Sequence, residues 1–171
     1  MAQRGLAHRS TRTSKAALDL AGPFWDFLFF GREGEELSLR LWDKGIKIVY
    51  YPKAVIHHRE VLAKGKQSRI KGGKREYYDF RNSLYIYLTR YPNWLIWRFL
   101  PLRVAVVFMR SFKRRNLKHF FRALWDVTRQ LPKLQTLRQP IQQDTARFYV
   151  ELMKEHGPLR WNLQTWLRHK F

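Results

Sequence analysis

The stretch FFGREGEELSLRLWDKGIKIVYYPKAVIHHR, from Phe29 to Arg59, carries most of the information on the fold. Its first part predicts a short helix over Glu33 to Lys44. Leu37 and Leu41 lie four residues apart and share one helical face, and Gly45 then supplies a C-terminal stop. A compact amphipathic helix is therefore expected directly after an aromatic cluster.

The second part of the stretch predicts a strand. Residues Ile46 to Pro52 alternate, are rich in β-branched and aromatic side chains and end at a proline. We expect Ala54 to His57 to continue this strand. Helix followed by strand predicts an α/β class for Leu18 to Ile56, with a few strands of a mixed sheet.

The rest of the chain has a helical pattern. A Gly- and Lys-rich segment, Ala63 to Lys74, is expected to be a mobile basic loop, because it has almost nothing to bury. Helices are predicted after it over Tyr77 to Leu88, ending at Pro92; over Asn93 to Phe112, with a bend at Pro101; over Leu117 to Leu131, stopped by Pro132; and over Asp144 to His156.

The charge is strongly positive. The 171 residues include 34 Lys and Arg against 13 Asp and Glu, a formal net charge of +21, and 16% are aromatic. Such a chain points to a polyanionic neighbour, either nucleic acid or an anionic membrane face. The absence of cysteine excludes a disulfide framework and thiolate metal sites.

Basic and aromatic residues alternate in the helical part. No acid occurs between Asp79 and Asp126, whereas arginines and lysines are interleaved there with Trp and Phe. This mixture favours peripheral docking on an anionic membrane at its cytoplasmic face, where each base adds roughly 1 kcal/mol. No run is apolar enough to span a bilayer, since Arg98, Pro101 and Arg103 interrupt the best candidate.

Three acids stand out in this basic chain, namely Glu33, Glu35 and Glu36. Glu33 and Glu36 lie three residues apart and face the same way on a helix. Acids in a first helical turn are favoured by the helix dipole, so a purely structural role is one interpretation. A carboxylate site is the other, because the cluster follows a Gly-Pro-aromatic loop and precedes a strand with His57 and His58 beyond it.

These residues resemble a known family. The run GPFWDFLFFGREGEELSLRLWDKGIKIVYYPKAVIHH is similar to the carboxy-terminal half of the catalytic domain in family 2 glycosyltransferases of the GT-A fold, especially the bacterial rhamnosyltransferase-like group. The matching positions include Gly22, Phe24, Phe29, Phe30, Glu33, Glu36, Leu37, Ser38, Arg40, Gly45, Pro52, Ala54 and His58, followed by Arg81 and Asn82. The resemblance covers roughly Leu18 to Pro140.

The resemblance implies an inverting transfer of a sugar from a nucleotide donor to a cell-envelope or lipid-linked glycan. Such a transfer needs a carboxylate that takes the proton of the attacking hydroxyl. It also needs Mg²⁺ or Mn²⁺ and cations at the departing diphosphate. The resemblance further implies substrate-binding roles for Trp25, Arg40, Lys71, Arg81 and Asn82, and a metal or diphosphate contact for His58.

Two departures from the family pattern bear on activity. The family places its base, an aspartate, directly after the first Glu, where this chain has Gly34, so Glu33, Glu35 or Glu36 has to serve, and Glu33 is favoured. The chain also contains no Asp-x-Asp motif for donor and metal. We therefore expect the carboxy-terminal portion of an enzyme that is inactive by itself.

The predicted organisation has three parts: a poorly ordered basic leader over 1–17, the glycosyltransferase portion over 18–91 and a basic amphipathic membrane-docking region over 92–171. Two other classes remain open. One is a small basic nucleic-acid-binding protein, although the sequence has no zinc spacing and no helix-turn-helix or ribonucleoprotein motif. The other is a membrane-associated module without chemistry.

Overall fold

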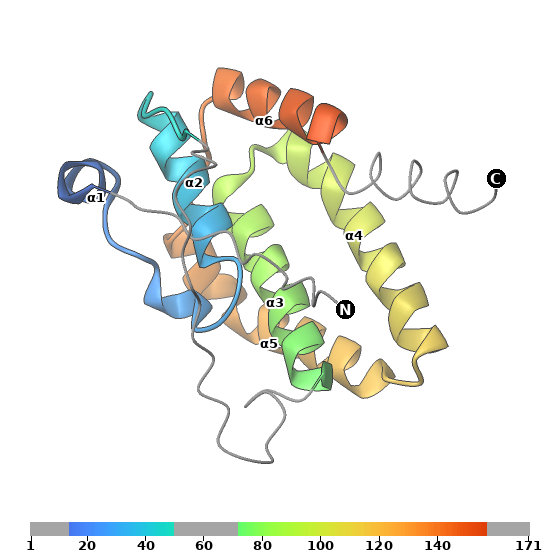
Figure 1. The fold of residues 1–171 in the computed structure, drawn as a ribbon. Coiled ribbons are helices and arrows are strands. Elements are labelled where there is room, and N and C mark those ends of the chain that lie inside the picture. The colour runs from blue at the N-terminus through green and yellow to red at the C-terminus, as the bar shows by residue number, and fades with distance from the viewer. Residues whose placement is uncertain (1–13, 50–71, 157–171) are drawn as a thin grey trace, which may run out of the picture.

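A computed structural model describes residues 14–49 and 72–156, and these two ranges are helical. Figure 1 shows α3 in the middle of the molecule, with α4 on one side and α6 across the top of the view. The helices are α1 Lys15–Ala21, α2 Glu33–Asp43, α3 Gly72–Arg90, α4 Asn93–Lys113, α5 Leu117–Thr136 and α6 Gln143–His156, and a short 3₁₀ helix, η1, covers Asp26–Leu28.

The predicted α/β class is wrong for the residues that the structure describes, because residues 14–49 and 72–156 contain no strand. Within the predicted strand, residues 46–49 have no regular secondary structure, while residues 50–52 and the expected continuation over 54–57 lie outside the described ranges. Alternation and β-branching favour an extended backbone, but a strand forms only when a neighbouring strand pairs with it. The described residues offer no such neighbour.

The helix predicted over Glu33 to Lys44 is confirmed as α2. It ends as its sequence predicts: Gly45 adopts a positive φ of 72°, its amide donates to the Trp42 carbonyl, and the Ile46 amide donates to the Leu41 carbonyl. This pair of bonds is a Schellman motif. Its glycine turns the chain away from the helix axis.

From Asn82 to its end, the central helix α3 is buried on nearly every side. The predicted helix over Tyr77 to Leu88 is confirmed, but α3 already begins at Gly72, so the predicted loop was wrong for its last three residues. The polar side chains of Ser83 and Thr89 are fully buried and donate to carbonyls of the helix itself. Among the described residues, no buried polar side-chain atom lacks a hydrogen-bond partner.

The other helices pack around α3. Both α4 and α5 contact it and each other, while α2 lies against α3 and α6. The predicted domain boundary between residues 91 and 92 therefore falls between two helices that pack together. The core contains stacked aromatic rings, including Phe80 on Phe120 and Tyr87 on Tyr91.

Two prolines lie inside helices. The predicted helix over Asn93 to Phe112 is confirmed as α4, which continues through Pro101. The predicted end at Leu131 is wrong, because α5 continues through Pro132 to Thr136. The helix predicted over Asp144 to His156 is confirmed as α6. None of the described helices combines the length and apolar character needed to cross a membrane.

Candidate functional site

The turn between η1 and α2 has an unusual backbone. Phe29 and Arg32 adopt φ values of 54° and 69°, and Gly31 between them adopts 82°. A positive φ is uncommon for residues other than glycine and is a source of strain for a bulky side chain such as Phe. Such conformations persist only where the surrounding structure holds them. Here that structure is α3.

Asn82 on α3 holds this turn in place. Its side chain is fully buried, and its amide nitrogen donates to the carbonyls of Leu28, Phe30 and Gly31 at 2.7, 2.7 and 2.8 Å. Arg81 adds a bond of 3.2 Å to the Leu28 carbonyl. The pair therefore fixes the backbone directly before the acidic cluster.

The three glutamates of the cluster have different surroundings. Glu33 is partly exposed and accepts one hydrogen bond, of 2.6 Å, from the Gly31 amide. Glu35 forms an ion pair of 2.5 Å with Arg32 and accepts from the Tyr149 hydroxyl at 3.3 Å. Glu33 is thus the least engaged carboxylate of the three among the described residues.

Glu36 is fully buried between two arginines. Arg40 Nε and Nη2 donate to its carboxylate at 2.8 Å each, and Arg90 Nε donates at 2.8 Å from α3. Arg40 also donates to the carbonyls of Ala21, Gly22 and Pro23. These bonds use Glu36 and Arg40 inside the fold, so neither side chain is presented to a ligand in this structure.

A second polar network lies beside the cluster. Asp79 on α3 accepts from Arg32 at 2.8 Å and from Arg103 of α4 at 2.5 Å. Burial alone would raise the pKa of the Asp79 carboxyl, but the two guanidinium groups outweigh burial and lower it. Burial likewise opposes the charge of Arg32, yet Glu35 and Asp79 raise the Arg32 pKa above its ordinary value.

This network continues into the core through two tyrosines. Tyr91 donates to the Tyr149 hydroxyl at 2.9 Å, and Tyr149 in turn donates to Glu35. Burial, reinforced by the charge of Glu35, raises the pKa of both hydroxyls. The helices α2, α3, α4 and α6 are therefore joined by one chain of hydrogen bonds and ion pairs.

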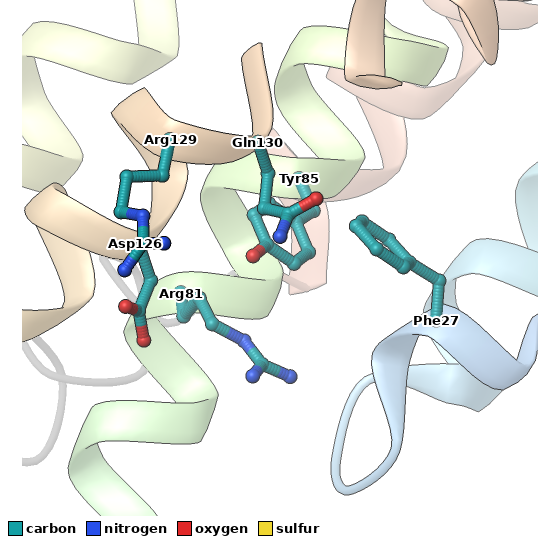
Figure 2. A pocket seen from close by; sticks show the side chains of 6 residues that line it. All are labelled: Phe27, Arg81, Tyr85, Asp126, Arg129 and Gln130. Carbon is teal, nitrogen blue, oxygen red and sulfur yellow. The ribbon is translucent and has the colours of Figure 1, made fainter. Parts of the chain in front are cut away.

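Arg81 also lines an open pocket of about 320 Å³, and Figure 2 shows the side chains around it. The Arg81 guanidinium points into the space between Phe27 and Asp126, and Arg129 supplies a second guanidinium. Arg81 also lies over the ring of Tyr78, 4.9 Å from its centre. The two arginines suit an anionic ligand, while the Asp126 carboxylate, which accepts from the Tyr77 hydroxyl, also lines the pocket.

Trp25, a predicted substrate-binding residue, precedes η1 and is partly buried. The Arg90 guanidinium lies 5.5 Å from the centre of its ring. The structure thus brings Trp25, Arg40 and Glu36 together around Arg90, whereas Arg81 faces the pocket and Asn82 the turn.

The remaining predicted residues, Lys71, His57 and His58, lie outside the described ranges, as does most of the predicted basic loop. Within those ranges, no group of three or more His, Asp or Glu side chains can hold a metal ion. Because His58 lies outside these ranges, the Mg²⁺ or Mn²⁺ that the resemblance implies stays a prediction.

Sequence reasoning missed Arg32, Asp79, Arg103 and Tyr149 as parts of the site. Asp79 lies 47 residues from Arg32 and 24 from Arg103, and Tyr149 lies 114 residues from Glu35. Local periodicity reports only on near neighbours along a helix. The one available signal was the isolation of Asp79 at the edge of an acid-free basic region.

Comparison with known proteins gives no match to a family model, a curated protein or a solved structure. The resemblance to family 2 glycosyltransferases therefore stays a prediction from the sequence.

Proposed function

We propose that the turn and helix around Glu33 form the acceptor side of a sugar-transfer site, in a glycosyltransferase that inverts configuration at the anomeric carbon. The observation that carries this proposal is the contrast among the three glutamates. Glu35 and Glu36 are engaged by arginines, whereas Glu33 is partly exposed and follows a strained turn that α3 holds rigidly. A general base needs a fixed position and an accessible oxygen.

In the proposed reaction, Glu33 accepts the proton of an acceptor hydroxyl as that oxygen attacks the anomeric carbon of the donor sugar. The new carbon–oxygen bond forms as the bond to the nucleotide diphosphate breaks, and the diphosphate leaves with the electron pair. Because attack and departure occur on opposite faces, the configuration inverts.

The pocket lined by Arg81 and Arg129 supports a phosphate-bearing substrate. Its guanidinium groups can neutralise a phosphate, and Lys133 adds a further cation 4.5 Å from the ring centre of Phe27. We assign no step to a metal ion, because the described residues do not supply a ligand set. Binding of the donor's sugar and nucleoside is not assigned to any of the described residues.

A substitution of Glu33 in the native gene tests this proposal. Glu33→Gln, introduced at the chromosomal codon, keeps an oxygen that can accept from the Gly31 amide but removes the base. Membranes from these cells are given radiolabelled nucleotide sugars, and transfer to lipid-extractable and polymeric glycan is measured. We expect transfer dependent on this protein to fall by about 10²–10⁴-fold.

Glu151→Gln is the matched control, since Glu151 is an exposed carboxylate on α6. It should leave transfer unchanged at an equal protein level on immunoblots. Equal transfer by the Glu33→Gln and Glu151→Gln strains would rule Glu33 out as the base. The purified chain should give no turnover with a sugar nucleotide, because it has no Asp-x-Asp motif; turnover would refute that part of the proposal.

A further inference from the structure

The outer face of α4 exposes a series of large apolar side chains, here called the stripe, with Arg98 among them. Its members are unevenly spaced along the chain, but at 3.6 residues per turn they fall on one broad side of the helix. They run from the first turn to the last, and each is at least 39% exposed: Trp94, Trp97, Leu102, Phe108, Met109 and Phe112. Trp97 and Phe112 are the most exposed, at 77% and 65%.

The stripe lies largely outside the core face of the same helix, and of its members Phe108 also packs against the buried Phe120. Leu95, Val107 and Ser111 are buried, and Arg103 points to α3, where it donates to Ser83 and Asp79. Other residues of α4 therefore make most of its contacts with the core of the described fold. Exposed apolar surface of this extent is uncommon on a soluble monomer unless it binds something.

The surroundings of the stripe are positively charged. No acid occurs in the sequence between Asp79 and Asp126. Exposed bases lie on α4, on its connection to α5 and in the first turn of α5, and they include Arg98, Arg110, Lys113, Arg114, Arg115 and Lys118. The partner of this surface must therefore combine an apolar layer with negative charge.

We propose that the α4 stripe docks on an anionic membrane surface, with α4 lying parallel to the bilayer. Tryptophan and phenylalanine side chains sit at headgroup depth, and the flanking bases contact lipid phosphates. Charge complementarity selects this occupant over an apolar partner of no charge. The inference does not depend on the proposed sugar transfer, because Glu33 and Arg81 take no part in it.

Vesicle binding of the full chain tests the apolar part of the proposal. Sedimentation is compared between vesicles of phosphatidylcholine alone and vesicles that also contain phosphatidylglycerol. The full chain should bind the anionic vesicles far more strongly. The double variant Trp97→Ala/Phe112→Ala should weaken this binding by about tenfold or more, because it removes two inserted rings.

Leu20→Ala is the control for lost apolar surface. Leu20 is 67% exposed on α1, which Figure 1 shows on the side of the molecule opposite α4. Its binding should equal that of the unsubstituted chain. Since every substituted residue is exposed, circular dichroism should show unchanged helix content in all these variants.

A second pair of variants tests the charge. Arg98→Gln/Lys113→Gln and Lys44→Gln/Lys47→Gln lower the net charge equally, and all four residues are exposed. Only the α4 pair should weaken binding, by roughly tenfold. Equal weakening by both pairs would mean that overall charge, and not this surface, drives binding, and would overturn the proposal.

Two further results would also overturn it. In the first, Trp97→Ala/Phe112→Ala abolishes binding of a single-stranded oligonucleotide but leaves vesicle binding intact. This result would assign the stripe to nucleic acid. The other is concentration-dependent dimerisation in analytical ultracentrifugation that the same variant abolishes, with vesicle binding unchanged. Tryptophan quenching by brominated lipid that falls in Trp97→Phe supports insertion.

Discussion

The carboxylate of Glu36 joins three segments of the chain. Arg40 brings in the residues after α1, and Arg90 brings in the end of α3. Burial of an ion makes strong pairing obligatory, since an unpaired charge in the interior costs several kcal/mol. The acid that the sequence marks as a catalytic candidate is thus used by the fold to position its neighbours.

We predict that Glu36→Gln lowers the free energy of unfolding by about 3–5 kcal/mol, because it leaves the buried Arg90 and the partly buried Arg40 without their counter-charge. Urea unfolding followed by circular dichroism measures the change. Glu151→Gln, at an exposed position on α6, should change stability by no more than about 0.5 kcal/mol. A loss of about 1 kcal/mol or less for Glu36→Gln would contradict this account.

The sequence singled out the acids around Glu33 but did not show how their surroundings differ. The three-residue spacing puts Glu33 and Glu36 on one side of α2, yet the two have different partners, and the ion pair of Glu36 with Arg40, four residues on, was not predicted. Spacing cannot distinguish the partly exposed Glu33 from the buried Glu36, because that difference arises from Arg90, 54 residues further along. Partners that lie in other helices were therefore not predictable from spacing.

At the scale of elements, hydrophobic periodicity predicted the helices well and their ends less well. Gly45 ended α2 as expected, because glycine readily adopts the required positive φ. The strand prediction failed over residues 46–49 because pairing partners, which periodicity does not report, decide strand formation. Pro132 failed as a stop signal because α5 packs against α3 and is buried on both sides of the proline, at Val127 and at Leu134.

The position of Pro132 inside α5 can be tested by substitution. Proline lacks the amide that would bond back to residue 128 and its ring crowds the preceding turn. Pro132→Ala should therefore raise the free energy of unfolding by about 1–3 kcal/mol, measured by urea denaturation.

Pro140→Ala is the matched control, since Pro140 lies outside the helices and is exposed. It should give no gain in stability, because no helical bond is restored there. If both variants behave alike, α5 ends near Leu131, as the sequence alone predicted.

At the scale of the whole molecule, tyrosine hydroxyls are concentrated inside. Burial raises the pKa of Tyr91 well above its ordinary value of 10.0, and it also raises the pKa of Tyr85, Tyr87 and Tyr149. These groups fold in their neutral form. The stability they contribute is therefore fully present below pH 10 and is lost as the pH rises above the unfolded pKa.

We predict that these buried tyrosines do not ionise gradually as the pH rises. Ultraviolet absorbance of tyrosinate should rise in two phases, with the second coinciding with loss of helical circular dichroism. Tyr149→Phe should reduce the amplitude of the second phase. Smooth titration of all tyrosines at about pH 10, with the helices intact, would contradict the buried hydroxyl chain.

The bond between Glu36 and Arg90 also sets an order of events during synthesis. Arg90 is translated 54 residues after Glu36, which takes about 3–10 s at the usual rate of ~5–20 residues per second. In that interval Arg40 is the only one of the two arginines that can neutralise Glu36. The carboxylate of Glu36 therefore acquires its full set of hydrogen bonds only after the end of α3 has been synthesised.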